Sequence, residues 1–483
     1  MATTLRRVRA LLLSTYELGH QPLHVGVPAA ALQRAGHQVR CIDLSVQDVD
    51  GADLRWAQAV AISVPMHTAM RLARTVRRQI EAAAPGLPVC FYGLYAAMDD
   101  GGLDDVTTIA GEYETDVVAW LESAPAATSV RHHVSLERRR PSLPARDMLP
   151  PLERYAHLVV NGERRLAGYV EASHGCAHRC RHCPVPVVYD GRTRIVPVED
   201  VVADVAQLVR LGARHLTFGD PDFLNGPQHA RRVVDAVHQA FPDLTFDVTA
   251  KVEHILAHRN LWPLLAERGC LFVITAVESA SDTVLARLDK GHTVADAVAA
   301  VSVLRAAGIE PRPSLLPFTP WTEPSDYMAL LDFVAHCDLV GNVDPVHYAI
   351  RLLVPPGSLL LDSGDLAGLL GPYDPERLTW TWRATDPRLD QLADEVSALA
   401  EASTGVAWDP AGAYRSVRAL ATDVLGPLVR PAPAPAPDPS LRSPYGVDAR
   451  PRLTESWFCC AEPTDVQWRD STRPLTIAPT GES

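Results

Sequence analysis

The sequence lacks any uninterrupted apolar run long enough to cross a membrane, which takes about 20 residues. It is also short of basic residues: 45 Lys and Arg stand against 58 Asp and Glu, and the formal net charge is −13 at pH 7. Binding along a phosphate backbone depends on cationic faces, so this balance argues against duplex nucleic acid as a partner. Arg138–Arg140 is the one dense basic run, and it indicates a solvated linker because Pro141 follows it.

A disulfide framework is absent as well. The nine cysteines are an odd set with one tight cluster, which is typical of a metal site in a reducing compartment. Leu5–Leu13 has an apolar part too short for a secretion signal, and Glu17 follows closely, so we expect a buried first strand there. We therefore expect a cytoplasmic protein, and its 483 residues indicate two or three domains.

The cysteine cluster consists of Cys176, Cys180 and Cys183, in the spacing Cx3Cx2C. Three thiolates on one short loop can ligate three irons of a [4Fe–4S] cube and leave the fourth iron open for a substrate or cofactor. A structural zinc site is the alternative, because His178 and His182 lie among the cysteines. Structural zinc sites usually pair two ligand clusters, and the sequence has no second CxxC, which favours iron–sulfur.

The Cx3Cx2C segment resembles the signature of the radical S-adenosylmethionine (radical SAM) superfamily. The resemblance implies that the open iron chelates the amino and carboxylate groups of SAM, and that one electron then cleaves the sulfonium. It also implies an external electron donor such as a flavodoxin or ferredoxin.

Downstream of the cysteines, short apolar runs alternate with amphipathic stretches, which predicts βαβ units and an open (β/α)6 barrel. The carboxyl ends of barrel strands carry the chemistry, and the cysteines follow the first strand directly. The predicted strands are Gly168–Ser173, Arg214–Gly219, Leu244–Ala250, Leu271–Val277, Ile309–Leu316 and Val346–Leu353. The predicted helices are Glu199–Leu211, Gln228–Ala240, Leu261–Arg268, Val294–Ala307 and Pro324–Cys337.

Other strand ends carry polar residues suited to SAM. Phe218–Phe223 resembles the Gly-Gly-Glu segment of the superfamily and places Asp220 in the acidic position, where it could accept hydrogen bonds from an ammonium group. Glu278 and Ser279 resemble the segment whose carboxylate and hydroxyl reach the nucleoside or amino-acid end of SAM. Three cations near strand ends could meet an anion, although solvated surface positions fit them better: Lys251, Lys290 and Arg312.

Residues 1–125 predict a separate doubly wound, Rossmann-like domain whose loops form a ligand crevice. The predicted strands are Val8–Tyr16, Val39–Leu44, Ala59–Val64 and Pro88–Tyr92, with helices over Val25–Ala35 and Met70–Ala84. Its position before a barrel resembles the cobalamin-binding domain of cobalamin-dependent radical SAM enzymes. The segments that carry this resemblance are Ala61–Pro65, Tyr92–Tyr95 and Gly111–Glu114.

The resemblance has a gap around His24. A histidine on the lower cobalamin face normally belongs to an Asp-x-His-x-x-Gly segment, whereas Gln21–Gly26 lacks the Asp and has its Gly too early. Either cobalamin binds without a histidine ligand, or the domain keeps the fold and has lost the cofactor. His24 and His67 then remain ordinary loop histidines.

The rest of the chain predicts a connector over 126–166, the barrel over 167–360, a helical extension over 361–430, and a linker and flexible tail over 431–483. Trp380 and Trp382 could cap the barrel mouth, although tryptophans at this spacing more often pack at a junction. Pro431–Pro439 predicts an extended spacer that gives the tail reach.

The tail contains Trp457–Pro463, with the adjacent pair Cys459 and Cys460. This segment resembles the ending of the CUAEP/CCAEP-tail radical SAM proteins, some of which carry selenocysteine at one of these positions. Adjacent thiols can bind a soft metal or metalloid, close a strained disulfide or supply an electron, so we predict that the pair enters the catalytic cycle. Two incidental cysteines in a disordered terminus are the alternative.

Together these features predict a radical SAM enzyme that forms a 5′-deoxyadenosyl radical and abstracts hydrogen from an unactivated carbon of an unidentified substrate. With cobalamin, methyl transfer is the favoured outcome. Without it, rearrangement or formation of a carbon–sulfur, carbon–selenium or carbon–arsenic bond fits equally well. The competing class is an iron–sulfur electron-transfer or metalloid-binding protein that does not cleave SAM.

Overall fold

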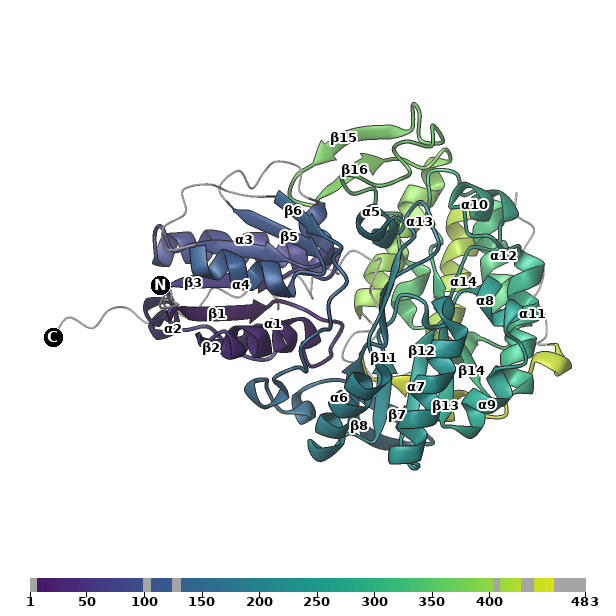
Figure 1. Cartoon of the computed structure of the whole chain (residues 1–483). Helices are drawn as coiled ribbons and strands as arrows, with labels where there is room; N and C mark the ends of the chain where they lie inside the picture. Colours follow the sequence, from purple (N-terminus) through teal and green to yellow (C-terminus); the bar gives the residue numbers. More distant parts are fainter. Residues whose placement is uncertain (1–6, 99–105, 124–131, 403–408, 427–437, 456–483) are drawn as a thin grey trace.

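The computed structural model describes residues 7–98, 106–123, 132–402, 409–426 and 438–455. It has a parallel sheet with flanking helices at the N-terminal side and a curled half-barrel beside it (Figure 1). The fold class predicted from the sequence is confirmed. Within the described ranges, none of the helices has the length and apolar character needed to cross a membrane.

The first sheet, sheet A, has the strand order β2-β1-β3-β4-β5-β6, and every neighbouring pair is parallel. Its middle strands are buried apolar runs because helices cover both faces. The strands are β1 (Arg9–Ser14), β2 (Gln38–Asp43), β3 (Ala59–Ser63), β4 (Val89–Tyr92), β5 (Thr107–Gly111) and β6 (His132–Ser135). The helices are α1 (Leu23–Arg34), α2 (Gly51–Trp56), α3 (His67–Ala83) and α4 (Glu114–Ser123).

The first four strands and the helices α1 and α3 lie where the sequence predicts them, within a few residues. The helices α2 and α4 and the strands β5 and β6 were not predicted from the sequence. The last strand, β6, comes from a stretch in which only a connector was expected. The alternating apolar pattern of a strand is weak there, because three of the four residues of β6 are exposed. These residues form a strand only because they pair with β5.

The second sheet, sheet B, has the order β14-β13-β12-β11-β8-β7-β17. Five parallel strands form the half-barrel, and β7 and β17 add an antiparallel edge. The strands are β7 (His157–Val160), β8 (Glu163–Val170), β11 (His215–Phe218), β12 (Thr245–Thr249), β13 (Cys270–Glu278), β14 (Glu310–Leu315) and β17 (Arg452–Leu453).

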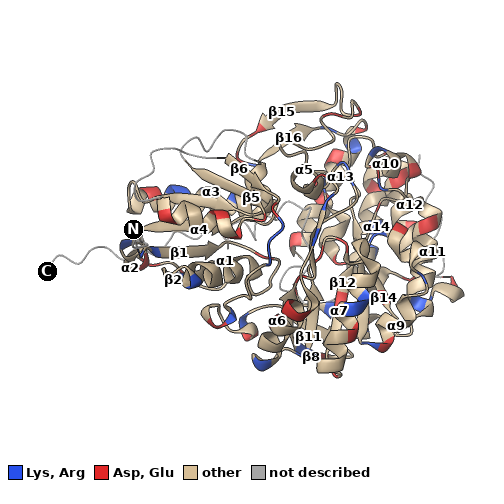
Figure 2. Ribbon diagram, in the orientation of Figure 1, with Lys and Arg blue, Asp and Glu red and all other residues tan. Residues whose placement is uncertain are grey.

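The outer helices of the half-barrel begin and end within two residues of the predicted bounds. These helices carry many of the charged residues of the half-barrel, whereas its inner strands carry few (Figure 2). They are α6 (Val198–Arg210), α7 (Pro227–Ala240), α9 (Trp262–Glu267), α11 (Val294–Ala306) and α12 (Pro324–His336), with the short helices α8 (Val252–Ala257) and α10 (Asp282–Arg287) between them.

The predicted sixth barrel strand, Val346–Leu353, is wrong. Its first residues belong to the 3-10 turn η6 (Pro345–Tyr348), and the rest joins the barrel only by an isolated parallel bridge between Phe318 and Arg351. The apolar run is still buried, because it packs against α12 and the C-terminal helices instead of pairing along a ladder.

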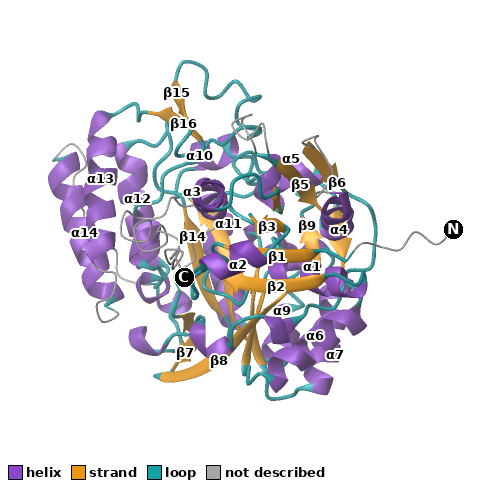
Figure 3. Cartoon of the chain, turned by 90° about the vertical axis from the view of Figure 1, so that its left-hand side faces the viewer, coloured by secondary structure: helices purple, strands orange, loops and turns teal. Residues whose placement is uncertain are grey.

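The C-terminal extension is not wholly helical. It begins with a hairpin, β15 (Leu370–Asp374) and β16 (Thr379–Trp382), and continues with α13 (Pro387–Ala402) and α14 (Pro410–Leu425), which lie side by side (Figure 3). The Trp382 indole donates to the carbonyl of Leu352, 2.8 Å away, and Arg351 stacks over its ring. This tryptophan therefore packs at a junction and does not cap the mouth.

Residues 438–455 bind the barrel again after the Pro-rich spacer. Arg450 forms a two-pronged ion pair with Asp338 at 2.9 and 3.0 Å, and β17 pairs with β7. Glu455, the last described residue, accepts a hydrogen bond from the Tyr16 hydroxyl, 2.8 Å away, in the loop after β1. The expectation that the spacer sets the reach of the tail is wrong, because the chain is held here before the tail begins.

Sheet A and sheet B share one continuous set of buried apolar side chains. Arg146 joins the two parts: its buried guanidinium contacts Asp204 of α6 at 2.7 Å, Gln21 at 3.1 Å and the carbonyl of Tyr169 at 2.7 Å. These contacts hold the carboxyl ends of the sheet A strands toward the half-barrel, so the loops of both sheets converge on one region.

Candidate active site at the barrel mouth

The three clustered cysteines lie on one loop at the carboxyl end of β8. The loop leaves the short strand β9 (Ser173–Gly175), which pairs with β10 (Thr193–Ile195), and ends in α5 (Val185–Tyr189). Gly175 has a φ of +74°, and a Cβ there would lie 2.3 Å from the Arg192 carbonyl oxygen, so the turn into the cysteines requires glycine.

Hydrogen bonds fix the cysteine loop against neighbouring strand ends. The Asn225 amide oxygen accepts from the backbone of Ala177 at 3.0 Å, and the Leu288 carbonyl accepts from the backbone of Arg181 at 3.0 Å. Within the loop, the Cys183 N–H donates to the carbonyl of Cys180 at 3.1 Å. The loop is therefore held at both ends by the elements that surround the mouth.

The donor set fits an iron–sulfur cluster. Cys176 and Cys180 are buried, Cys183 is half-buried, and none of the three forms a disulfide. Burial raises the pKa of the Cys176 thiol to about 11, so its thiolate requires a compensating positive charge such as iron. Three soft donors on one loop, with no fourth cysteine beside them among the described residues, match a cube bound at three corners.

Glu278 and Lys290 form a buried ion pair next to the cysteines. Lys290 Nζ lies 3.1 Å from Glu278 Oε1, and Nε2 of His182 lies 3.5 Å from the same oxygen. Burial alone would raise the pKa of Glu278, but Lys290 and His182 outweigh it and hold the pKa at about 2. Glu278 has a φ of +64°, at the point where the register between β13 and β14 shifts. This backbone conformation turns its carboxylate toward Lys290 and His182.

Ser279 follows on the same strand end and is buried. Its hydroxyl oxygen accepts from the Ser281 backbone at 3.2 Å, and its own N–H donates to the Val277 carbonyl at 2.8 Å. The structure therefore brings Glu278 and Ser279 to the mouth, with the carboxylate already paired by a lysine and a histidine.

Asp220 is buried at the end of β11, beneath the segment that leads to the cysteines. Its carboxylate accepts from the backbone of Ala172 at 2.9 Å and from the hydroxyl of Ser173. Burial raises the pKa of Asp220 to about 7. Both carboxylate oxygens are thus used within the protein, and they tie the end of β11 to the chain between β8 and β9.

The expectation that three cations are solvated at the surface is wrong for each of them. Lys290 pairs with Glu278, as above. Lys251 is buried with its Nζ 3.4 Å from Glu253, and Arg312 is buried 3.0 Å from Asp344. The partners of Lys290 and Arg312 come from strand ends and turns that are distant in sequence, so a reading of local segments could not find them.

The carboxyl edge of sheet A faces the mouth with a network of acids, histidines and tyrosines. His174 lies between Glu112 at 3.1 Å and Glu171 at 3.2 Å, and Tyr189 donates to Glu112 at 3.0 Å. Burial opposes protonation of His174, yet the two carboxylates raise its pKa well above the usual value.

His24 and His67 are not loop histidines, since they lie in the first turns of α1 and α3. Nδ1 of His24 lies 2.7 Å from the Tyr113 hydroxyl, and its Nε2 lies 3.5 Å from Glu171. Both ring nitrogens therefore have partners. The edge lies where doubly wound sheets bind ligands, and its residues fit cobalamin only in a form without His24 as a cobalt ligand.

Comparison with known proteins matches residues 170–334 to the Radical SAM superfamily. Residues 170–334 are a radical SAM domain. The predicted [4Fe–4S] cluster and SAM are the cofactors that this domain implies, and radical SAM enzymes need an external reductant. All three clustered cysteines, Asp220, Glu278 and Ser279 lie inside the matched range.

Curated relatives match the radical SAM domain rather than the whole chain. The ribosomal protein uS12 methylthiotransferase of Desulfosudis oleivorans is 29% identical over 176 residues, which cover 34% of this chain and 40% of that protein. The hopanoid C-2 methylase of Rhodopseudomonas palustris is 20% identical over 272 residues, or 53% of this chain and 48% of that protein. The chain thus spans about 40 to 48% of the length of these two relatives.

Solved structures resemble the radical SAM domain together with sheet A. The cobalamin-dependent radical SAM enzyme OxsB with aqua-cobalamin bound has a TM-score of 0.64 at 15% identity, covering 83% of this chain and 68% of that one. The radical SAM methyltransferase TsrM of Kitasatospora setae, with cobalamin and a [4Fe–4S] cluster bound, has a TM-score of 0.60 at 16% identity. It covers 87% of this chain and 99% of that one, so the likeness in fold extends beyond the domain.

Two residues of functional interest, Asp222 and His254, were not predicted from the sequence. Asp222 lies in the same segment as Asp220, and its side chain, 0% exposed, contacts His254 at the start of α8. Only the fold brings these two strand ends together. Cys459 and Cys460 lie outside the described residues.

Proposed function

We propose that the chain is a radical SAM enzyme in which Cys176, Cys180 and Cys183 hold a [4Fe–4S] cluster. The observation that supports it is the placement of three thiols on one glycine-dependent loop at the mouth of a half-barrel. When bound, the cluster and SAM supply reductive cleavage of the sulfonium to methionine and a 5′-deoxyadenosyl radical. An external donor such as a flavodoxin or ferredoxin would supply the electron in the cytoplasm.

The residues around the cysteines prepare this site before any cofactor binds. Burial opposes the charge of Lys290, but Glu278 first, and then the nearby Cys180 and Cys183, raise its pKa, so a positive charge lies beside the site of an anionic cluster. Glu278 and Ser279 would contact SAM beside this cation, and Asp220 would hold the cysteine loop in register with β11. Burial of these groups excludes water from the region in which a radical would form.

We further propose that the carboxyl edge of sheet A binds cobalamin and that the reaction is methylation of an unactivated carbon. The likeness in fold to OxsB and TsrM supports this. Because Tyr113 and Glu171 already contact both nitrogens of His24, the cobalt would have no ligand from this histidine. Without cobalamin, rearrangement or carbon–sulfur, carbon–selenium or carbon–arsenic bond formation remains the alternative, and the methylthiotransferase relatives favour the sulfur case.

The tail pair Cys459 and Cys460 is proposed to take part in turnover, as in the CUAEP/CCAEP-tail family. The position of Glu455 supports this proposal, because it limits the distance between Cys459 and the described part of the fold. Glu455 lines a small, partly open pocket together with His20, Arg312 and His347, between the loop after β1 and the strands β13 and β14. A chain spans at most about 3.5 Å per residue, so four residues bring Cys459 within about 14 Å of this point.

Anaerobic reconstitution tests the proposed function. The purified chain is loaded with iron and sulfide, reduced with dithionite and given SAM, and 5′-deoxyadenosine is measured. Its formation is expected. Cluster assembly without SAM cleavage would favour an electron-transfer or metalloid-binding protein, and one zinc with no iron would refute the iron–sulfur site. Binding of hydroxocobalamin, followed by its absorption spectrum, tests the role of sheet A separately.

A further inference from the structure

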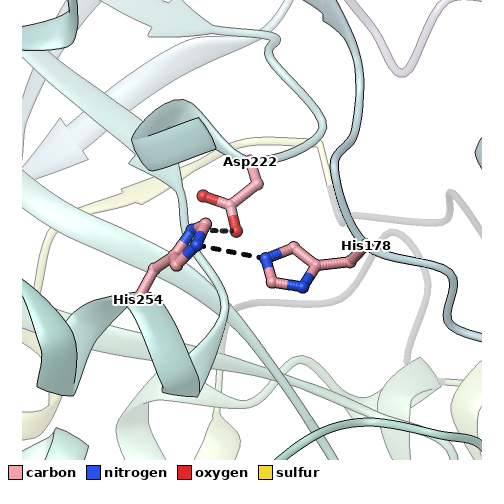
Figure 4. Close-up of side chains that lie close together, drawn as sticks. All are labelled: His178, Asp222 and His254. Atoms are coloured by element: carbon pink, nitrogen blue, oxygen red, sulfur yellow. Dashed lines mark hydrogen bonds and ion pairs between the residues drawn. The ribbon is translucent and has the colours of Figure 1, made fainter. Parts of the chain in front are cut away.

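Three side chains beside the cysteine loop form a cluster that the proposed radical chemistry does not use: His178, Asp222 and His254 (Figure 4). One nitrogen from each histidine and one oxygen of the aspartate all lie within 4.8 Å of one another. Nε2 of His178 is 3.1 Å from Nε2 of His254, and Nδ1 of His254 is 2.9 Å from Oδ2 of Asp222. The three side chains point toward a common centre.

Three different elements of the fold supply these side chains. His178 comes from the loop between Cys176 and Cys180, Asp222 precedes the 3-10 turn η4 (Phe223–Asn225) after β11, and His254 lies in the first turn of α8 after β12. All three therefore lie at the carboxyl ends of neighbouring strands. The sequence separates them by 76 residues, and only the half-barrel brings them together.

Asp222 is fixed before any ion arrives. Its side chain is 0% exposed, one oxygen accepts from the backbone of Leu224 at 2.9 Å, and the other lies 3.3 Å from the backbone nitrogen of Lys251. A buried carboxylate that has only backbone and imidazole partners carries a charge that a cation would balance. The position of the carboxylate is therefore fixed, and a cation bound beside it would balance its charge.

The second nitrogen of His178 has an acidic neighbour as well. Nδ1 lies 3.7 Å from Oε2 of Glu253, which leaves Nε2 to face the centre. Histidines that bind metals commonly direct their other ring nitrogen at a carboxylate, which fixes the tautomer. The side chains of His178 and His254 are 18% and 16% exposed, so an ion can reach the centre from solvent.

We propose that His178, His254 and Asp222 bind one divalent first-row transition metal ion, separate from the iron of the three-cysteine site. Two imidazoles and a carboxylate suit zinc or iron(II) and leave coordination positions open for water or substrate. The hydrogen bond between the two imidazoles would give way to the ion, because one nitrogen of each histidine would then offer its lone pair to the metal. The ion would also tie the cysteine loop to the ends of β11 and β12.

The test measures zinc and iron in the full-length protein after anaerobic cluster reconstitution in the presence of zinc and desalting. One zinc per chain is expected in addition to the cluster iron. The zinc X-ray absorption spectrum should show only nitrogen and oxygen neighbours at about 2.0–2.1 Å, whereas zinc captured by the cysteines would show sulfur at about 2.3 Å. Iron-loaded protein without zinc, or zinc with sulfur neighbours, overturns the proposal.

Variants assign the zinc to these residues. His254→Ala and Asp222→Asn should each lose the zinc and keep the cluster iron, and the iron content shows that the variant has folded. His258→Ala is the matched control: it removes the histidine that directly follows α8, whose ring centroid is 5.7 Å from that of His254, and should keep the zinc. Zinc retained in His254→Ala refutes the site. If a variant also loses its iron, the wild-type spectrum still decides between the two donor sets.

Discussion

The barrel mouth and the carboxyl edge of sheet A face each other, yet they balance charge in different ways. At the mouth, the buried Glu278 carboxylate is balanced by the ammonium group of Lys290. At the edge of sheet A, Glu112 and Glu171 share His174 and are bound by tyrosine hydroxyls. The mouth is thus arranged around positive charge that suits an anionic cluster, whereas the edge forms a closed hydrogen-bonded network between two parts of the fold.

The largest expected effect falls on the mouth. Cys183→Ala should abolish 5′-deoxyadenosine formation, a loss of more than about 100-fold. Mutating a residue that only hydrogen-bonds to a metal ligand typically costs about 10- to 100-fold in activity, and losing a ligand itself should cost more. Iron content and 5′-deoxyadenosine are measured after reconstitution. Cys41→Ala, which changes a partly exposed cysteine of β2, is the control and should leave both unchanged. Normal cleavage in Cys183→Ala would show that the loop is not the cluster site.

A second prediction separates buried from exposed pairing at the mouth. Lys290→Met leaves the buried Glu278 carboxylate without its main counter-charge and should lower the free energy of unfolding by about 3–5 kcal/mol. Lys251→Met should cost much less, about 1 kcal/mol, because the side chain of its partner Glu253 is 46% exposed. Guanidinium unfolding of the cluster-free proteins measures both.

The double variant Lys290→Met/Glu278→Gln serves as the control for this prediction. It removes both charges and should recover part of the loss, as a double-mutant cycle requires for a coupled pair. Equal costs for the two lysine variants would contradict the view that the mouth depends on buried charge balance.

The mouth and the edge also differ in how far the sequence predicts them. The spacing of Cys176, Cys180 and Cys183 predicts a ligand loop because all three donors lie within one turn-rich segment. The network around His174 could not be predicted, because its partners Glu112 and Glu171 come from two sheets. The cations were misjudged for the same reason: burial of Lys290 and Arg312 depends on partners that only the fold supplies.

Strand prediction failed where the apolar pattern of the side chains does not coincide with backbone pairing between strands. The strands β1 and β11–β14 are largely buried runs with parallel neighbours, so their pattern and their pairing agree. The predicted first barrel strand, Gly168–Ser173, overlaps β8 only at its end, because the exposed first residues of β8 are strand through pairing with β7. Val346–Leu353 is equally apolar but packs against helices, so its apolar pattern, which reflects burial only, was wrongly interpreted as a strand. In contrast, β6 and β17 are short and partly exposed, and they are strands only because an edge of a sheet lies beside them.

The edge network should respond to acid. Burial would raise the pKa of Glu171, but His24, His174 and Tyr169 lower it to about 2. A carboxyl whose folded pKa is lowered stabilises the fold above its ordinary pKa of 4.5, and that contribution, at most about 3 kcal/mol, is lost as the pH falls toward 2. Urea unfolding between pH 6 and about pH 3 should show this decline.

Glu171→Gln should remove that part of the decline, because a glutamine cannot titrate. Glu163→Gln is the matched control at the start of β8, the strand that ends just before Glu171, and its exposed side chain should change the pH dependence little. An unchanged acid dependence in Glu171→Gln would mean that the charges at the edge of sheet A are not coupled to folding.

The smallest expected effect concerns the contact between the loop after β1 and Glu455, the last residue that the structure describes. Tyr16→Phe removes the hydroxyl that donates to Glu455 and should cost about 1 kcal/mol, because the half-buried carboxylate loses its donor. The variant should also make residues after 455 more accessible to limited proteolysis, while cluster iron stays constant. Glu455→Gln keeps an acceptor for Tyr16 and should show a smaller change. If Tyr16→Phe alters neither unfolding nor proteolysis, this hydrogen bond does not hold the base of the tail, and the short reach proposed for Cys459 loses its support.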